Sequence, residues 1–202
     1  MTTTEPASPL GRPREFDTDA VLDVVVDLFW EKGYGATSVG DIVERTGLSK
    51  SSIYGAFGSK DALYEKALDR YLVGHRQALE ERLINGSRGL DDVDQFFDGV
   101  EDQVRQSETR GCLAVNTATE LRTSEPVLVQ LGARHRAAMR EAFAAALTRA
   151  ADLGEIEPHR VDDLANNLVT TALGFGVMVG GGASAEEVRA HLASVRASLR
   201  NP

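Results

Sequence analysis

The segment from Thr46 to Lys60 combines lysines and hydroxyl side chains with a complete absence of carboxylates. Ammonium and hydroxyl groups donate hydrogen bonds to phosphate oxygens, and both also reach the edges of bases. The side chains that we expect to provide this chemistry are Ser49, Lys50, Ser51, Ser52, Tyr54 and Lys60. The segment therefore suits contact with nucleic acid.

Two short helices joined by a glycine turn are predicted to position these groups. Ser38 caps the first helix, and Gly47 supplies the residue that a tight turn after it requires. Ser49 caps the second helix, in which Ile53 and Phe57 lie four residues apart and face inward, so the polar side chains face outward. This is the geometry of a helix-turn-helix, which places its second helix in a major groove. Any small helical domain can contain a similar passage, so the neighbouring residues decide between the two interpretations.

A further helix start follows directly and strengthens the nucleic-acid interpretation. Gly58 and Ser59 end the second helix and cap the next, so a helix N-terminus lies beside Lys60, where both could hold a phosphate. The run FWEKGYGATSVGDIVERTGLSKSSIYGAFGSKDALYEKAL resembles the DNA-binding domain of the TetR family of transcriptional regulators. The resemblance covers roughly the first third of the chain. The residues that match the family's habitual ones in order and spacing are Phe29, Gly33, Tyr34, Thr37, Gly47, Tyr54, Phe57, Lys60 and Leu63.

The resemblance implies which side chains touch DNA. Tyr54 is expected to reach a phosphate, and Lys50 or Ser52 a base edge. The sequence departs from the family at Gly55 and Ala56, where many members carry larger aromatic or basic side chains. Base reading is therefore expected to depend more on the first turn of the helix or on DNA shape. The predicted DNA-binding residues are Arg12, Arg14, Thr37, Ser38, Ser49, Lys50, Ser51, Ser52, Tyr54 and Lys60.

Residues 1–13 are predicted to form a flexible arm, because its first nine residues are small, polar and proline-containing. Arg12 and Arg14 lie where this arm meets the first helix. Arginines in such arms enter the adjacent minor groove, where narrow A·T tracts concentrate negative potential. They could equally be solubilising charges on a tail.

The whole chain is predicted to be all-α, because it is rich in helix-forming residues and no segment alternates as a strand would. The resemblance implies an N-terminal three-helix helix-turn-helix DNA-binding domain at residues 14–74. Residues 75–202 then form a C-terminal helical domain for ligand binding and dimerisation. A helix from Ser59 to about Ile84 bridges the two, so the boundary falls inside a helix. The implied protein is a homodimer that binds a palindromic double-stranded operator, most often as a repressor, and leaves it on sensing an unknown small molecule.

Composition and charge limit the remaining classes. The net charge is −9, and residues 1–60 hold six Lys and Arg against nine Asp and Glu, so DNA binding depends on where the cations lie. The first residues contain no apolar h-region, so no signal peptide is predicted. A single cysteine, Cys112, rules out an internal disulfide and suits a reducing cytoplasm. We expect no cofactor.

The histidines do not form a catalytic or metal-binding motif. They fall one to a predicted helix, with no H-E-x-x-H, no cysteine cluster and no G-x-S-x-G. We therefore predict no catalytic residue and no metal ligand, although the sequence leaves open whether His75 and His135 converge in space. A helical module that merely dimerises would explain the apolar end of the chain but not the segment from Thr46 to Lys60.

Five helices are expected after the bridging helix. Asp91 caps the first, and residues 112–121 form the second. The third begins at Ser124 and Pro126 and ends at Leu153. The fourth runs from Pro158 through residue 183, and Ser184 caps the fifth.

Residues 165–185 carry no charged side chain and approach the length of a bilayer span, about 20 residues. Asn166 and Asn167 are costly in lipid and no basic cluster flanks the segment, so we predict no membrane contact. Its glycines fit neither G-x-G-x-x-G nor a Walker motif. We expect a helix that packs one face on its own core and another on a second subunit. The predicted dimer interface is Leu173, Val177, Val188, Leu192 and Val195.

An apolar cavity with a few polar contacts is predicted for the small molecule, although apolar residues at helical spacing also fit a plain core. Its predicted residues are Phe96, Phe97, Cys112, Asn116, Glu120, His135, Met139, Phe143, Phe175 and Met178.

Cys112 has two interpretations. It lies at the expected N-terminus of a helix, two residues after Arg110, and both features favour the reactive thiolate. Some regulators of the resembled family carry a comparable Gly-Cys and use it as a redox or electrophile sensor, whereas others carry it with no known chemistry. The other interpretation is a small residue buried under the loop.

Overall fold

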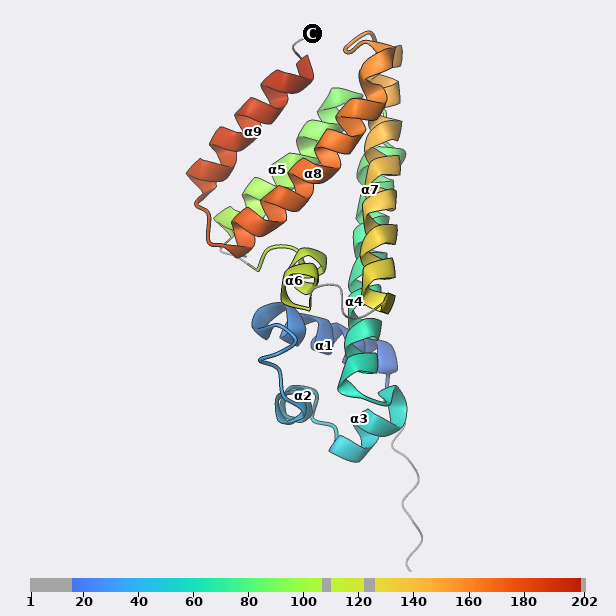
Figure 1. The fold of residues 1–202 in the computed structure, drawn as a ribbon, viewed down its shortest axis with the longest axis vertical. Coiled ribbons are helices and arrows are strands. Elements are labelled where there is room, and N and C mark those ends of the chain that lie inside the picture. Colours follow the sequence, from blue (N-terminus) through green and yellow to red (C-terminus); the bar gives the residue numbers. More distant parts are fainter. Residues whose placement is uncertain (1–15, 107–109, 122–125, 201–202) are drawn as a thin grey trace, which may run out of the picture.

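The computed structural model describes residues 16–106, 110–121 and 126–200. Within these ranges every regular element is a helix, as the sequence predicts. Three short helices, α1 (Thr18–Lys32), α2 (Val39–Thr46) and α3 (Lys50–Phe57), lie at one end of an elongated molecule, and the C-terminal end of the chain lies at the other (Figure 1). Arg12 and Arg14 fall outside the described residues.

The starts of these helices follow the predicted capping residues. The Ser38 hydroxyl accepts from the backbone N–H of Asp41, whose carboxylate accepts from the Ser38 N–H in return. Ser49 caps α3 through the Ser52 N–H. Between them Gly47 adopts a φ of +68°, the left-handed conformation that ends α2 and turns the chain into α3.

The long helix α4 (Lys60–Leu79) runs from the three-helix end into the rest of the molecule and finishes in a π-helical turn, η1 (Glu80–Ile84). It connects two apolar cores. Leu72 packs in the core formed with α1 to α3, and Leu79 packs in the core of the later helices. The aromatic centre of the first core is an edge-to-face contact of Phe29 with Tyr64, with ring centroids 4.7 Å apart.

Five α-helices make up the remainder of the described chain. They are α5 (Leu90–Arg105), α6 (Leu113–Glu120), α7 (Pro126–Asp152), α8 (Val161–Gly180), which follows a 3-10 turn η2 (Pro158–Arg160), and α9 (Ala185–Arg200). The long helices α4 and α7 run beside each other, and α5, α8 and α9 pack to one side of them (Figure 1).

Two of the predicted starts have different outcomes. Ser184 caps α9, because its hydroxyl accepts from the Glu187 N–H and its own N–H donates to the Glu187 carboxylate. The predicted cap at Asp91 is wrong. Gly89 occupies the cap position with a φ of +61° and provides no side-chain cap. The next carboxylate, Asp92, is buried instead and accepts from the Arg88 N–H. Ser124 lies outside the described residues.

Arginines hold α9 against α5. Arg196 pairs with Asp94 at 3.1 Å and also with Asp98, and Arg189 pairs with Glu101 at 2.8 Å. Beneath these pairs the α9 residues Val188, Leu192 and Leu199 are buried in the protomer's own core. No helix in the described part of the chain is long and apolar enough to cross a membrane.

Candidate functional site

The outer face of α3 presents the polar groups that the sequence singles out. Ile53 and Phe57 are buried, whereas Lys50, Ser51 and Tyr54 are exposed. The Lys50 Nζ lies 5.7 Å from the centre of the Tyr54 ring, so the ammonium and the phenol occupy the same patch. Because residues 46–60 contain no carboxylate, no side chain of this segment would repel a phosphate.

Thr37 and Ser38 lie before α2 and serve the fold. The Thr37 side chain is 0% exposed and its hydroxyl donates to the Gly33 carbonyl at 2.6 Å, so the expectation that this side chain faces DNA is corrected. Ser38 is exposed, but its hydroxyl caps α2. Position 37 therefore needs a threonine for the fold. In the sequence its polar side chain suggested a DNA contact instead.

Lys60 stands at the N-terminus of α4 and is anchored there. Its Nζ donates to the Tyr34 carbonyl at 2.6 Å and lies 4.1 Å from the centre of the Tyr34 ring. An ammonium has three donors, so this anchoring leaves hydrogen-bonding capacity for a phosphate at the helix terminus.

Glu120, at the end of α6, binds the loop between α1 and α2. Its carboxylate accepts from the backbone N–H groups of Tyr34, at 3.0 Å, and Gly35. A Cβ at Gly33 or at Gly35 would lie 3.0 Å from this carboxylate, so glycine leaves space for it. The expectation that Glu120 lines a ligand pocket is therefore corrected. It connects the later helices to the three-helix end.

Two further contacts join the same regions. The Trp30 indole N–H donates to the Gly111 carbonyl at 3.1 Å, and the Arg110 guanidinium stacks on the Trp30 ring and pairs with Asp27 at 3.0 Å. Gly111 in turn lies directly against α8. With a φ of +66°, it would place a Cβ 2.5 Å from the Gly176 carbonyl oxygen. The chain around α6 is thus wedged between α8 and α1.

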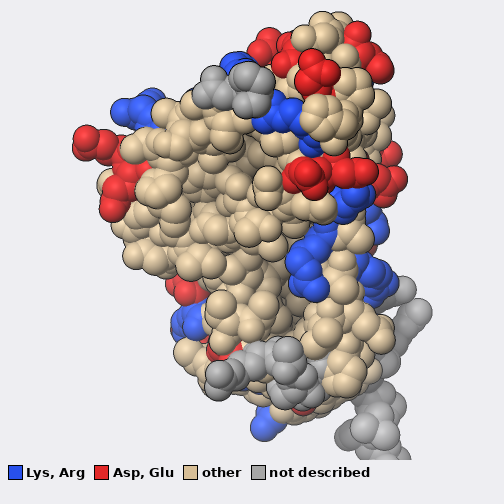
Figure 2. Space-filling view, turned by 45° about the horizontal axis from the view of Figure 1, so that its top comes forward, with Lys and Arg blue, Asp and Glu red and all other residues tan. Residues whose placement is uncertain are grey.

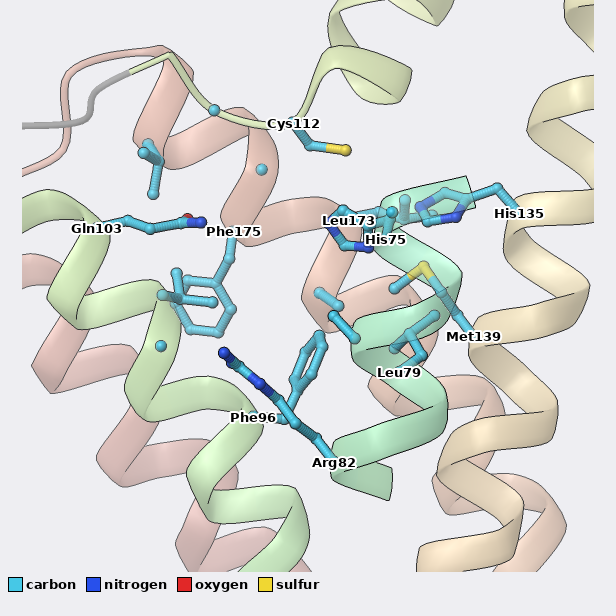
Figure 3. A pocket seen from close by; sticks show the side chains of 18 of the residues that line it. His75, Leu79, Arg82, Phe96, Gln103, Cys112, His135, Met139, Leu173 and Phe175 are labelled. Atoms are coloured by element: carbon cyan, nitrogen blue, oxygen red, sulfur yellow. The ribbon is translucent and has the colours of Figure 1, made fainter. Parts of the chain in front are cut away.

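A cavity of about 600 Å³ lies between α4, α5, α7 and α8 (Figure 3). Five predicted residues line it: Phe96, Cys112, His135, Met139 and Phe175. Sequence reasoning missed other wall residues, among them Tyr71, His75, Arg82 and Gln103. The sequence pattern did not single out these residues, because they lie at the edges of apolar helix faces or in an irregular turn.

The other predicted pocket residues have different places. Phe97 and Phe143 are buried and stack on each other in the core, with ring centroids 6.0 Å apart. Met178 packs against that core. The Asn116 side chain donates to the Arg110 carbonyl at 2.9 Å and so holds the loop before α6. None of these four is among the residues that line the cavity.

Two histidines meet in the cavity wall. The rings of His75 and His135 are perpendicular, with centroids 5.2 Å apart. Burial lowers the pKa of His75, and burial together with His75 lowers the pKa of His135 to about 4, so both rings are neutral at pH 7. The Nδ1 atom of His75 is buried and has no hydrogen-bond partner among the described residues. No group of three or more metal-binding side chains occurs in the described part of the chain.

Cys112 is half-buried at the top of the cavity as drawn in Figure 3. Its Sγ accepts from the Tyr71 hydroxyl at 3.6 Å. Burial raises the pKa of Tyr71, so the phenol keeps the proton that it donates. Arg110, the cation expected beside the thiol, is engaged by Asp27 and Trp30 instead.

The predicted interface residues divide into three groups. Val177 is 55% exposed on α8, and Val195 is half-buried. Val188 and Leu192 are 0% exposed in their own protomer, and Leu173 lines the cavity, so the expectation that these three form an outer face is corrected. The outward side chains of α8 are uncharged over most of its length, and Figure 2 shows a broad face with few charged groups on that side of the molecule.

Comparisons with known proteins agree with this geometry. Residues 21–67 match the family described as bacterial regulatory proteins, tetR family, and residues 89–192 match the tetracyclin repressor-like C-terminal domain. The chain is 33% identical to the HTH-type transcriptional repressor ComR of Escherichia coli strain K12 over 183 residues, which cover 88% of this chain and 86% of ComR. It is also 33% identical to the HTH-type regulator YezE of Bacillus subtilis strain 168 over 154 residues, 76% of this chain and 79% of YezE.

A solved structure of similar fold contains DNA. The TetR family regulator CifR, a cysteine mutant complexed with a 26-bp double-strand operator, superposes with a TM-score of 0.80 at 27% identity. The alignment covers 93% of this chain and 99% of CifR.

Proposed function

The chain belongs to the tetR family of bacterial regulatory proteins, and from that premise we propose that it is a repressor that a small molecule releases from a near-palindromic operator. It is a DNA-binding transcriptional regulator and not an enzyme. The observation that carries the proposal is the exposed, carboxylate-free face of α3, which a helix-turn-helix presents to a major groove. Repression is supported by the relative ComR, which is a repressor and aligns over most of this chain. A regulator of DNA acts where the DNA is, so we assign it to the cytoplasm.

Two copies of the chain are proposed to pair through the outward faces of α8 and α9. On α8 the outward residues include Asn167, Thr170, Gly174 and Val177, which are exposed and uncharged. Small residues let helices approach closely, and an uncharged face is cheap to remove from water. A two-fold axis there would place the two α3 helices about 34 to 36 Å apart, one turn of duplex. The operator is then expected to repeat in inverted half-sites at that spacing.

The proposed assignment of functions to the two domains follows the two apolar cores. We propose that residues 14–74 bind DNA and that residues 75–202 bind the effector and the second subunit. The boundary then lies inside α4, between Leu72 of the first core and Leu79 of the second. Such a continuous helix transmits a tilt without a flexible linker.

The chain around α6 offers a second route for the signal. Cys112 and Gly111 line the cavity, while Trp30 binds the Gly111 carbonyl and Glu120 binds the α1–α2 loop. A ligand that moves the cavity wall would therefore shift the three-helix end directly. Release requires that the ligand bind the shifted state more tightly than the DNA-bound state.

Lys60→Ala tests the DNA interface. Selection of duplexes from a random pool should first yield a near-palindrome for the native protein. On that duplex we expect Lys60→Ala to weaken binding, to weaken binding to unrelated duplexes to the same degree, and to lower the salt slope by about one per subunit, since one phosphate contact is lost. Lys66→Ala, which removes an exposed lysine further along α4, is the matched control. An unchanged slope in a fully folded Lys60→Ala protein would refute the contact.

Covalent sensing at Cys112 is the second candidate, favoured by the position of its thiol in the cavity wall. On this hypothesis methylglyoxal or hypochlorite releases the protein from its operator, and Cys112→Ser keeps DNA binding but loses the response. Gel-shift titrations of both proteins measure this. Equal release of the two, or a native thiol that excess iodoacetamide does not alkylate, would leave a non-covalent ligand as the signal.

A further inference from the structure

Arg82 is the one described side chain in the cavity wall that is positively charged at pH 7. The described part of the wall contains no lysine, and both of its histidines are neutral at pH 7 because burial lowers their pKa values. The Arg82 guanidinium forms no ion pair or hydrogen bond with any other described residue. By contrast, the arginines on α9 that face α5 are paired with carboxylates. Arg82 is therefore a solvent-exposed cation that lines the cavity and is not neutralised by a described carboxylate.

The backbone around Arg82 favours this orientation. Arg82 lies in the π-helical turn Glu80–Ile84, a rare conformation that is frequent at functional sites. Across the cavity, α5 carries Gly99, where an added Cβ would lie 3.0 Å from the Arg82 Nη1. Glycine inside a helix lowers helix stability, so Gly99 has a cost that another advantage must offset. The absent side chain leaves room for the guanidinium to extend over α5 into the cavity (Figure 3).

Large apolar side chains make up one part of the wall, which also contains polar groups such as Gln103. Leu79, Phe96, Met139 and Phe175 project into the cavity from four different elements (Figure 3). At the opposite end from Arg82, the His75 ring lines the wall, and its buried Nδ1 has no hydrogen-bond partner among the described residues. Arg82 and His75 are seven residues apart on one continuous helical stretch, which separates their backbones by about 10 Å. The volume of about 600 Å³ lies in the range typical of small-molecule sites.

We propose that the effector is an apolar, ring-bearing carboxylate, with its carboxylate on Arg82 and a polar atom at its far end on His75. This inference rests on the proposed function and names the ligand class of its cavity. A guanidinium matches a carboxylate with two parallel, charge-assisted N–H···O bonds. The wall also contains Asp102, which forms no ion pair among the described residues, so a cationic ligand is the competing chemistry.

Matched pairs of acids and amides test the carboxylate. The probes are 4-hydroxyphenyl derivatives of acetate, propanoate and butanoate, each beside its primary amide, titrated by calorimetry into the full-length dimer without DNA. At least one acid should bind, and its amide should bind about tenfold or more weakly, because the charge-assisted bonds are lost. Equal affinity of acid and amide, or no binding by any of the three acids at millimolar concentration, would overturn the proposal.

Variants of the two charged wall residues supply the second arm. Arg82→Met should weaken the acid about tenfold to a hundredfold and abolish the preference over the amide, and Arg82→Lys should retain part of it. Asp102→Asn is the matched control and should keep the preference. Thermal melts establish that each variant is folded. If Asp102→Asn abolishes binding while Arg82→Met does not, the ligand is a cation and the assignment is wrong.

Operator release is measured separately, so the two proposals fail in different ways. If the acid binds through Arg82 but leaves the operator complex intact, the proposal that the ligand releases the protein from DNA is refuted, and the carboxylate site is retained. If an uncharged compound releases the native protein and Arg82→Met equally from the operator, ligand-induced release is supported and the carboxylate site is refuted.

Discussion

Val177→Asp is expected to convert the dimer into a monomer and to lower operator affinity by about a hundredfold or more. Val177 is 55% exposed on α8 and lies on the uncharged face proposed to pair. A carboxylate buried in the interface without a partner would raise the free energy of the dimer by roughly 3 to 5 kcal/mol. A monomer holds one half-site and loses the effective concentration that the second subunit supplies. Sedimentation measures the first effect and fluorescence anisotropy on the operator measures the second.

A valine on another helix provides the control for this experiment. Val129 is 42% exposed on α7, away from the proposed interface, so Val129→Asp should remain dimeric and bind the operator normally. Leu192→Asp does not test the interface, because Leu192 is buried on the inner face of α9 in its own protomer and a carboxylate there would disrupt the core. A Val177→Asp protein that sediments as a dimer would place the interface elsewhere.

Glu120→Gln is expected to uncouple the cavity from DNA while both halves still bind their own ligands. The variant keeps the size of the side chain but removes its charge, and it replaces one of the two oxygens that accept from the Tyr34 and Gly35 N–H groups with an NH₂ group that cannot accept. If these bonds carry the signal, the factor by which the ligand lowers operator affinity should fall by about tenfold. Operator affinity with and without saturating ligand gives this factor directly.

A carboxylate with the same kind of contact elsewhere is the control for coupling. Glu155 accepts from the Leu90 N–H at 2.8 Å, within the later helices. Glu155→Gln should cost some stability and leave the coupling factor unchanged. If Glu120→Gln also leaves the factor unchanged, the signal travels through α4 alone.

Local chemistry made the DNA-binding end predictable. Ser38, Gly47 and Ser49 act through hydrogen bonds and dihedral angles within a few residues, so their positions in the sequence define the helix boundaries. The same reasoning failed at Asp91, where the neighbouring Asp92 is buried and pairs both with Arg88, four residues before it, and with the distant Arg149. Capping signals are reliable only where no long-range partner competes for the side chain.

The cavity was less predictable, because it depends on how separate helices meet. Phe96 and Phe97 are neighbours in one apolar stripe, yet the first lines the cavity and the second fills the core behind it. Arg82 reads as an ordinary surface residue until the π-helical turn and Gly99 are seen together. Glu120 likewise gives no sign in the sequence that its partners are backbone groups 85 and 86 residues away.

Three of the contacts that join the α6 region to the three-helix end use main-chain atoms, namely the Tyr34 and Gly35 N–H groups and the Gly111 carbonyl, and others use side chains of α1 and α4 such as Asp27 and Tyr64. Main-chain atoms are present whatever the side chain, and α3 itself packs chiefly on α2 and α4. The reading face of α3 can therefore accumulate substitutions without disturbing the joint. Operator preference in this scaffold is an exchangeable part, and gene duplication could give a copy new target sites while it continues to answer to the same small molecule.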